Sequence, residues 1–299
     1  MKLEQNIELS QAVTRRTWRD GFETFVVRTG GAETAVVPEL GAKVLSLRNL
    51  RTGREWLYHR HARLKLFPNK PGDNFSASTV AGWDECLPTI APCQWQGHAI
   101  PDHGEVWSVP WELDEADWRR GVIKTSVRLP VSPLQFVRTI ELRHNTLHIG
   151  YLLLNLSSGP QEFLWAMHPL LALQEGDELD LSAESRRLLQ NQPWVRSLKF
   201  DKNNAGCAKA YAGPLQHGRA GVLNSISGDR LSFSWDTTEC NTLGIWLTRG
   251  GWSDHHHLAL EPTNGAPDAL SVAAGKCKRC GLIAPHGEKQ WSVQIEVAP

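Results

Sequence analysis

Leu134-Gln135-Phe136-Val137-Arg138-Thr139-Ile140-Glu141-Leu142-Arg143 is the stretch of sequence that decides the fold. Apolar and polar residues alternate along it, with Leu134, Phe136, Ile140 and Leu142 on one face and Gln135, Thr139, Glu141 and Arg143 on the other. Successive side chains of a β-strand point to opposite faces, so a period of two indicates a strand with one buried face. The stretch therefore predicts a strand of an antiparallel sheet that covers a core.

Two further stretches alternate in the same way. One carries Leu147, Ile149, Tyr151 and Leu153, and the other carries Trp291, Val293, Ile295 and Val297 with Ser292, Gln294 and Glu296 opposite. The turn-forming residues His144-Asn145-Thr146 separate the first of them from 134–143, which predicts a β-hairpin.

Shorter β-type segments precede these strands. They are Phe22 to Val27, Ala35 to Pro38 and Lys43 to Leu50, broken by glycines. No stretch of ~12 residues sustains a period of 3.6, so long helices are not expected. Neither a fixed repeat nor a linker-like shift in composition appears. We therefore expect an all-β protein in which residues 1–299 form one domain of two large, packed, mostly antiparallel sheets, least regular over 174–230.

Composition excludes several classes of partner. The 299 residues include 32 Lys+Arg and 32 Asp+Glu, so the net charge is +0 and nothing favours nucleic acid or an anionic membrane. The segment from Met1 to Asn6 becomes polar at once, and no window approaches the ~18 apolar residues of a membrane span. We expect a soluble, cytoplasmic protein, either a monomer or a homodimer.

The cysteines and tryptophans give weaker indications. Six cysteines without a secretion signal predict reduced thiols, and Cys277-Lys278-Arg279-Cys280 lacks the second pair that a zinc ribbon needs. Thirteen tryptophans against three tyrosines is an unusual balance. Tryptophan offers a flat apolar face on which a sugar ring can stack.

Glu261 is the first candidate for chemistry. It follows the apolar segment His255 to Leu260 and precedes Pro262 and the turn-rich segment Thr263 to Asp268. Pro262 favours an extended backbone at Glu261, which we expect at the end of a strand, where it is placed to act as a general base. The alternative is an ordinary strand-end glutamate that caps the strand or pairs with a surface lysine.

His168 is the second candidate. It lies in the apolar segment Phe163 to Leu173, where a buried imidazole needs a hydrogen-bond partner. Pro169 cannot donate to a sheet ladder, which predicts that His168 lies at an edge or a bend beside a cleft. A structural histidine in the core is the alternative.

Two turn-rich segments offer further polar residues. Gly82 to Thr89 and Pro101 to Trp107 are expected to be loops at the rim of a pocket, and Gly104 would let the backbone approach a ligand. The candidates there are Trp83, Asp84, Glu85, Asp102, His103, Glu105 and Trp107. For the carboxylates, a solvated acidic rim is the alternative.

Histidine runs raise the question of a metal site. His59-Arg60-His61 and His255-His256-His257 place imidazoles at alternate strand positions, and Asp84, Glu85 or Glu105 could complete a site. Histidines in such runs next to turns are more often exposed, so no metal ion and no cofactor are expected.

The motifs together resemble a known family. Asp102-His103-Gly104, His168-Pro169, Leu260-Glu261-Pro262 and Pro267-Asp268-Ala269 follow in the order and approximate spacing of the galactose mutarotase-like (aldose 1-epimerase) family. Gly82 to Thr89 resembles the pocket segment of its bacterial members, and Ala35 to Val44 resembles its opening strand pair. The resemblance spans about residues 33–297 and is more specific for the fold than for the substrate.

The resemblance implies a β-supersandwich whose concave face holds a monosaccharide, and a reaction that interconverts the α and β anomers of an aldose. By position, Glu261 would take the proton from the anomeric hydroxyl, and His168 would protonate the ring oxygen. His103 would hydrogen-bond near the same oxygen. An imidazole with a pKa near ~6.5 suits proton exchange at neutral pH, and Glu261 would work best where partial desolvation raises its pKa.

The sequence departs from the family pattern in two places. Family members often follow the histidine with Ser-Tyr-Phe-Asn-Leu, whereas this chain has Pro169 to Leu173. Members that act on hexose 6-phosphates carry an arginine soon after His-Gly, whereas this chain has Glu105, whose carboxylate would repel a phosphate. An unphosphorylated aldose is therefore expected. Two alternatives stay open: a sugar-binding protein without turnover, and a glycosidase- or lyase-type enzyme that pairs Glu261 with an acid from 84–105.

Overall fold

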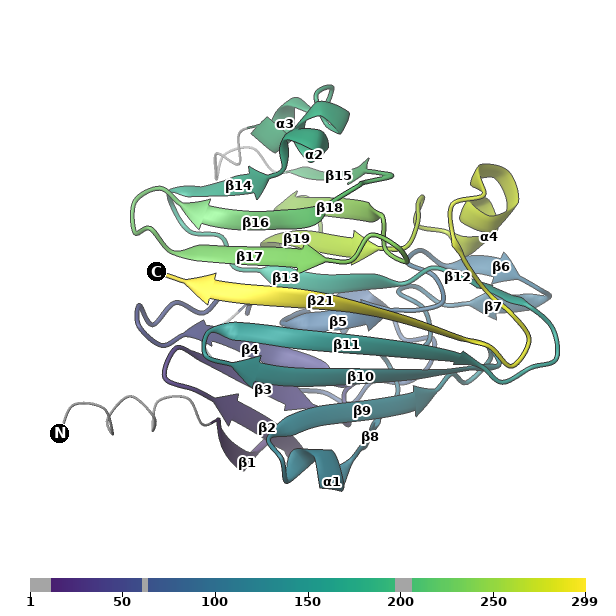
Figure 1. Ribbon diagram of the computed structural model, residues 1–299, viewed down its shortest axis with the longest axis horizontal. Coiled ribbons are helices and arrows are strands. Elements are labelled where there is room, and N and C mark those ends of the chain that lie inside the picture. Colours follow the sequence, from purple (N-terminus) through teal and green to yellow (C-terminus); the bar gives the residue numbers. More distant parts are fainter. Residues whose placement is uncertain (1–11, 61–63, 197–205) are drawn as a thin grey trace.

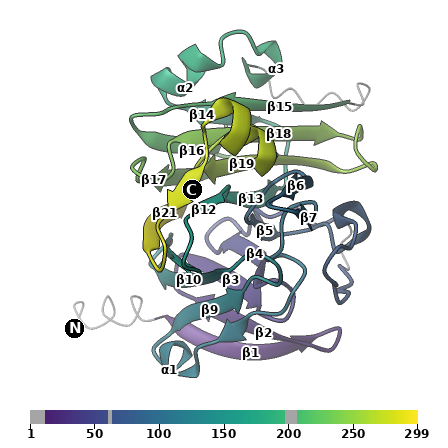
Figure 2. The same ribbon diagram turned by 90° about the vertical axis from the view of Figure 1, so that its right-hand side faces the viewer.

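The structure is a computed structural model that describes residues 12–60, 64–196 and 206–299. Two large sheets lie face to face, with the eight-stranded sheet in front in Figure 1 and the nine-stranded sheet behind it. Figure 2 shows the same layers after a quarter turn. The polar entry segment expected over 1–20 falls partly outside the described residues, which begin at Ala12.

The nine-stranded sheet is antiparallel throughout. Its strands in spatial order are β1 (Val13–Arg19), β2 (Phe22–Arg28), β3 (Ala32–Val37), β4 (Lys43–Asn49), β5 (Trp83–Cys86), β13 (Ala166–Leu171), β19 (His256–Thr263), β18 (Thr242–Arg249) and β15 (Gly206–Ala212). Its central strands come from three distant parts of the sequence.

The eight-stranded sheet contains the three alternating stretches. Its strands in spatial order are β14 (Asp177–Leu181), β16 (Gly218–Asn224), β17 (Arg230–Trp235), β21 (Glu288–Ala298), β11 (Thr146–Asn155), β10 (Leu134–Arg143), β9 (Val122–Arg128) and β8 (Glu112–Leu113). Arg143 pairs with Thr146, so the hairpin at His144-Asn145 is confirmed. The all-β architecture of two large sheets is confirmed as well.

The remaining elements are short. A small hairpin joins β6 (Cys93–Trp95) to β7 (His98–Ile100), and β12 (Gln161–Phe163) pairs with the distant β20 (Gly281–Ile283) in a second two-stranded sheet. The helical turns are η3 (Phe75–Ala77), α1 (Glu115–Trp118), α2 (Ala183–Leu188), α3 (Pro193–Arg196), α4 (Leu270–Val272) and the π-type turn η4 (Ala273–Cys277). Within the described ranges, no helix has the length and apolar character that a bilayer crossing requires.

The main core lies between the two sheets, and one buried ion pair joins them. Arg138 of β10 is fully buried among apolar residues, and its Nη1 lies 3.0 Å from Glu85 Oε1 on β5. Neighbouring strand residues point to opposite faces. Glu85 therefore faces the eight-stranded sheet, while Asp84 and Cys86 face the opposite side of the nine-stranded sheet. β5 thus has a structural face and a face available for a site.

Three local predictions were wrong. Trp83 to Cys86 form a buried strand rather than a rim loop. β19 continues through Glu261 and Pro262 to Thr263, so Glu261 is not at the strand end. His168 lies on β13, between β5 and β19 in the middle of the sheet, not at an edge.

The sheet tolerates both prolines because of where they lie. The Cα partners of β13 and β19 are Ala166–Thr263, Leu170–Ala259 and Leu171–Leu258. Pro169 and Pro262, which have no N–H to donate, lie between these pairs. Proline therefore changes the pairing of two interior strands next to His168 and Glu261, where we had expected it to mark an edge.

Candidate active site

A row of polar residues crosses the nine-stranded sheet on the face turned away from the core. Asp84 of β5 pairs with His168 of β13, and Glu261 of β19 pairs with Gly244 of β18. Lys43 of β4 forms a buried ion pair with Asp84 at one end of this row. Directly opposed residues of an antiparallel pair share a face. The sheet therefore brings together side chains that are up to about 200 positions apart in the chain.

His168 and Glu261 meet in the middle of this row. Nδ1 of His168 lies 2.7 Å from Oε1 of Glu261, and both side chains are buried. An ionised carboxylate can only accept hydrogen bonds, so Nδ1 carries the proton of this contact. The other ring nitrogen, Nε2, is then the one that remains for a ligand.

Gly244 provides the space for the carboxylate. A Cβ atom at position 244 would lie 2.6 Å from Glu261 Oε2 and 3.2 Å from the ring of Tyr211. The first distance is below any normal contact. A side chain at this position would therefore push Glu261 out of its place.

Lys209 of β15 contacts the second oxygen of Glu261 and links it to the loop residue Asp268 and to Tyr211 of β15. Lys209 Nζ lies 2.9 Å from Glu261 Oε2 and 2.8 Å from Asp268 Oδ1. The hydroxyl of Tyr211 donates to the same oxygen of Asp268. Lys209 thus bridges two carboxylates.

This environment sets the charge of Glu261. Burial by itself raises the pKa of Glu261, but the Lys209 ammonium and the hydrogen bond from His168 outweigh it and hold the pKa at about 2. Burial lowers the pKa of Lys209, but Glu261 and Asp268 outweigh that effect and raise the pKa well above its ordinary value. Both groups are charged at neutral pH. Partial desolvation with a raised pKa, which we had expected for a catalytic glutamate, is not what the site provides.

His103 reaches the same place from the loop after β7. Its ring stacks on Phe75 at 3.8 Å with an interplanar angle of 13°, and its centroid lies 4.9 Å from that of His168. Its Nδ1 lies 3.1 Å from Asp102 Oδ2. Burial lowers the pKa of His103, and this outweighs the opposing effect of the Asp102 carboxylate. The lowered pKa favours a neutral imidazole at His103.

The backbone of this loop is held in an uncommon conformation. His103 has φ of 59°, in the left-handed region that few non-glycine residues adopt. Gly104 has φ of 75°, and a Cβ atom there would lie 2.1 Å from the carbonyl oxygen of Leu87. Glycine at 104 therefore allows the loop to close against the end of β5 and to present His103.

These residues line a pocket of about 210 Å³. Its polar side chains include Asp102, His103, His168, Lys209, His257 and Asp268, and its aromatic walls are Phe75, Trp246 and Trp252. Pockets for drug-sized ligands measure ~300–1,000 Å³, so this one suits a smaller molecule such as a single sugar ring. Glu261 lies beneath the pocket, behind His168 and Lys209.

The structure places the other predicted residues outside the pocket lining. Glu85 accepts hydrogen bonds from Trp83, Arg138, Tyr151 and Trp165 and belongs to the core. Asp84 pairs with Lys43. Both are buried, so neither forms the solvated acidic rim that was the alternative.

Glu105 and the two tryptophans have structural contacts. Glu105 accepts from the backbone N–H groups of Val131 and Ser132, at 2.6 and 3.2 Å, and holds the turn between β9 and β10. Trp83 lies in the core. The ring centroid of Trp107 lies 5.2 Å from that of Phe75, which it supports in the pocket wall, and its Nε1–H donates to the carbonyl of Asp102.

Sequence reasoning missed several residues in and around the pocket. Lys209 and Tyr211 lie in the region that we predicted to be least regular, and their alternate positions on β15 were the available signal. Asp268 was quoted only as part of a motif. His257 is fully buried and neither of its ring nitrogens has a hydrogen-bond partner among the residues that the structure describes. Burial lowers the pKa of His257 well below the ordinary value.

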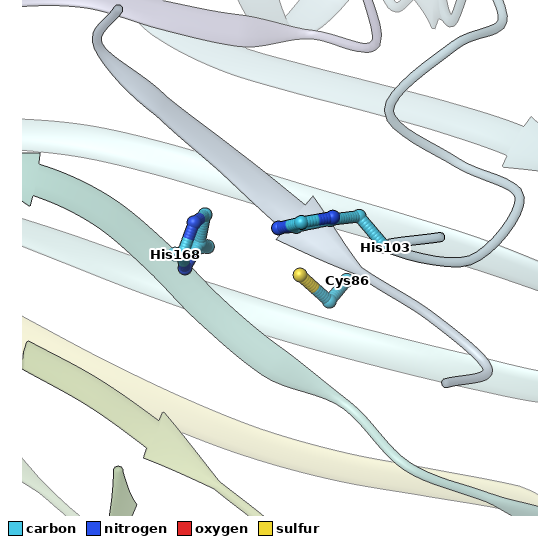
Figure 3. Close-up of side chains that lie close together, drawn as sticks. All are labelled: Cys86, His103 and His168. Carbon is cyan, nitrogen blue, oxygen red and sulfur yellow. The ribbon is translucent and has the colours of Figure 1, made fainter. Parts of the chain in front are cut away.

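Among the described residues, the histidines of these runs do not gather into a group of metal ligands. His59 Nε2 contacts the carbonyl of Leu45 at 2.6 Å, His61 lies outside the described residues, and His255 packs against Tyr58 and Trp252. In the described part of the chain, the potential ligand atoms gather instead at Cys86, His103 and His168 (Figure 3).

Comparisons with known proteins agree on the fold. No protein-family model matches the sequence, and no curated protein does. Solved structures that are similar include a galactose mutarotase-like protein from Clostridium acetobutylicum, with a TM-score of 0.70, 13% identity and coverage of 96% of this chain and 99% of that one. A protein from Klebsiella pneumoniae with a provisional assignment as an aldose 1-epimerase has a TM-score of 0.74 and 14% identity, over 96% of this chain and 87% of that one.

A third similar structure is longer than this chain. It is a TPR-domain containing protein from Parabacteroides distasonis, with a TM-score of 0.66 and 12% identity, over 93% of this chain and 47% of that one. At these identities the likeness shows the fold alone. The chain therefore has the galactose mutarotase-like fold that the resemblance implied.

Proposed function

We propose that the protein interconverts the α and β anomers of an unphosphorylated aldose. The observation that carries this proposal is the pair of His168 and Glu261, 2.7 Å apart on adjacent strands at the base of a pocket of about 210 Å³. The pocket has aromatic walls and several convergent polar groups, as small-molecule sites commonly do. The order of motifs in the sequence supports the same reaction.

The chemistry divides between the two groups. His168, protonated at Nε2, gives its proton to the ring oxygen while the bond from that oxygen to the anomeric carbon breaks. Glu261 takes the proton of the anomeric hydroxyl, and the open-chain aldehyde forms. Rotation about the bond next to the aldehyde and reversal of both proton transfers close the ring on its other face. His103, 4.9 Å from His168 between ring centroids, is placed to hydrogen-bond near the same oxygen.

Lys209 adds a condition to this mechanism. A carboxylate with a pKa of about 2 is a weak base, and both oxygens of Glu261 are engaged in the resting site. Proton removal by Glu261 therefore requires that the anomeric hydroxyl take the place of Lys209 at Oε2. Asp268 can keep the ammonium during that exchange, because it already contacts Lys209 at 2.8 Å.

The charge of the pocket supports a neutral sugar, although not for the reason that the sequence suggested. Glu105 does not face the pocket, so its carboxylate cannot repel a phosphate there. Among the described residues that line the pocket, Lys209 is the one lysine or arginine, and two carboxylates already neutralise it. Within that described lining, a phosphate would find no lysine or arginine that is not already paired.

A sugar-binding role without turnover is the second candidate. The burial of Glu261 and its contact with Lys209 favour it, because they weaken the base that the reaction needs.

Magnetisation-exchange NMR over a panel of free aldoses tests both candidates. We expect faster exchange between the two anomeric signals of at least one sugar. His168→Asn and Glu261→Gln should each slow it by ~100- to 10,000-fold, the usual contribution of a positioned acid or base. His98→Asn and Glu112→Gln, at exposed positions, serve as matched controls. Sugar binding without faster exchange would favour the second candidate, and no response to any aldose would contradict both.

A further inference from the structure

We propose that Cys86, His103 and His168 form a binding site for a thiophilic divalent metal ion of the Zn²⁺ class, and that this ion and the sugar exclude each other. One ligand atom from each residue, the thiol Sγ or a ring nitrogen, lies within 4.8 Å of the other two. Figure 3 shows the cysteine sulfur beside the imidazole of His103, with the imidazole of His168 across from both. The metal-binding part stands on this geometry alone, whereas the exclusion of sugar also rests on the proposed function.

The fold brings the three residues together from separate elements. Cys86 of β5 is paired with Ala166 of β13, two residues before His168, so both side chains project from the same face. A parallel bridge between Leu87 and Gly104 ties the loop of His103 to the end of β5. The left-handed backbone at His103 is the kind of local strain that functional sites store.

A carboxylate stands behind each imidazole. Asp102 Oδ2 lies 3.1 Å from Nδ1 of His103, and Glu261 Oε1 lies 2.7 Å from Nδ1 of His168. The hydrogen bond at Nδ1 of His168 leaves its Nε2 for a ligand. At His103 the carboxylate of Asp102 lies beside Nδ1 without a hydrogen bond of good geometry, and its position favours Nε2 as the ligand atom there as well. Histidines that bind metals almost always donate the other ring N–H to a carboxylate, a carbonyl or water, which fixes the ring and increases its basicity.

The donor set selects the class of ion. One thiolate and two imidazoles suit Zn²⁺ and similar borderline-soft ions, and not the hard ions Mg²⁺ and Ca²⁺, which prefer oxygen. Tetrahedral Zn²⁺ would hold these ligand atoms roughly 3.4–3.6 Å apart, so the cluster would contract by about 1 Å on binding. The Cys86 thiol loses its proton to solvent as the Zn–S bond forms. The fourth position would open to the pocket.

The same atoms explain the exclusion. A metal ion on Nε2 of His168 takes the lone pair that would carry the proton for the sugar ring oxygen. A sugar ring above His168 and His103 in turn occupies the space of the ion and its fourth ligand. We therefore expect Zn²⁺ to inhibit competitively.

Metal binding is measured without any sugar. Metal-free full-length protein competes with a chromophoric chelator for Zn²⁺, and Co²⁺ is added in a separate titration. We expect one tight Zn²⁺ per chain and, with Co²⁺, a thiolate-to-metal charge-transfer band. Cys86→Ala should weaken Zn²⁺ binding by more than about 100-fold and abolish the band, and Asp102→Asn should weaken it by ~10–100-fold. Cys240→Ala, at another buried cysteine, is the matched control and should bind as the wild type does.

The Co²⁺ band in the wild type keeps the test valid even if a variant fails to fold. Absence of that band, or equal Zn²⁺ affinity in the Cys86→Ala and Cys240→Ala variants, would overturn the proposed site. For the exclusion, Zn²⁺ should slow anomer exchange in the wild type but not in Cys86→Ala. Zn²⁺ that binds without slowing exchange would overturn it. Zn²⁺ binding without exchange of any aldose would instead support the site and contradict the proposed function.

Discussion

At the scale of single residues, the site is governed by which charges surround Glu261. Burial alone would make this carboxyl a stronger base, but Lys209 and His168 hold it ionised with a pKa of about 2. Without Lys209, burial would raise the pKa of Glu261 against the opposing effect of His168, and the same His168–Glu261 pair would contain a stronger base. The chemistry of the site therefore depends on a cation that no motif indicated.

Replacement of Lys209 tests this directly. In Lys209→Met the burial of Glu261 is opposed by His168 alone, so the pKa of Glu261 rises from about 2. The base then loses its charge at a higher pH as the solution is acidified. We expect the acid limb of the pH profile of kcat/KM for anomer exchange to move up by about 1–3 pH units.

The control is Lys124→Met, which removes a surface lysine paired with Asp114 and Asp117. Its profile should match that of the wild type. If the acid limb of the pH profile does not move in Lys209→Met, then this limb does not reflect the ionisation of Glu261.

Glu105 separates a structural role from a binding role. Its carboxylate accepts from Val131 and Ser132, and it does not line the pocket. Glu105→Gln should lower the free energy of unfolding by about 1–3 kcal/mol, because a buried acceptor and its donors lose charge-assisted bonds. Urea unfolding measures this, with Glu112→Gln as an exposed control, and KM for sugar should stay unchanged. A large rise in KM with unchanged stability would restore the binding role that the sequence suggested.

At the scale of elements, β18 decides whether Glu261 can occupy its place. Gly244 faces Glu261 across the strand pair, and the carboxylate fills the volume that a side chain would need. A glycine inside a strand often marks such a close approach. The pairing of β18 with β19 is thus part of the site.

Gly244→Ala should therefore move the carboxylate rather than only strain the sheet. We expect exchange activity to fall by ~100-fold or more, as for loss of a positioned base, and stability to fall by ~1–3 kcal/mol from overpacking. Exchange NMR and urea unfolding measure the two effects. Gly150→Ala on β11, where an added Cβ meets nothing within 4 Å, is the matched control and should retain activity. Full activity in Gly244→Ala would contradict the role of Glu261.

At the scale of the whole molecule, the ion pair of Arg138 and Glu85 joins the two sheets beneath the site. Burial raises the pKa of Glu85, although Arg138 and the donors from Trp165 and Tyr151 oppose the effect. β5 carries Glu85 on one face and Cys86 on the other. The core contact therefore also holds one strand of the site.

Arg138→Met should destabilise the protein by ~3–5 kcal/mol at pH 8, because it leaves a buried carboxylate without its cation. A carboxyl whose pKa is raised on folding binds its proton more tightly in the native state. The destabilisation by Arg138→Met should therefore become smaller as the pH falls through the raised pKa of Glu85 toward the ordinary carboxyl value of about 4.5. Urea unfolding between pH 5 and 8 measures this destabilisation. The control is Arg143→Met, which breaks the exposed ion pair of Arg143 with Glu141 and should lower the free energy of unfolding by at most ~1 kcal/mol. A cost that is independent of pH would contradict this account.

The alternating segments predicted three strands of the eight-stranded sheet, β10, β11 and β21, because a side chain that faces a core must be apolar wherever the strand lies. The same rule failed for the central strands of the nine-stranded sheet. Trp83 to Cys86 read as a loop because both faces of this strand are buried and each of them carries a carboxylate. His168 read as an edge residue because of Pro169, whereas β13 lies inside the sheet and its pairing with β19 continues on both sides of the proline. One domain over 1–299, the cytoplasmic location and the state of assembly stay predictions.

Local pattern was sufficient for the class of fold, for the hairpin at 144–145 and for the choice of His168, His103 and Glu261 as residues to watch. Those properties follow from the order of side chains along one strand or one motif. The partners of Glu261, the burial of Glu85 and Glu105, and the gathering of Cys86 with two histidines came only with the folded chain. They depend on strand pairing between segments far apart in sequence, and the charge and hydration of a carboxyl are set by what lies within a few ångströms of it in space.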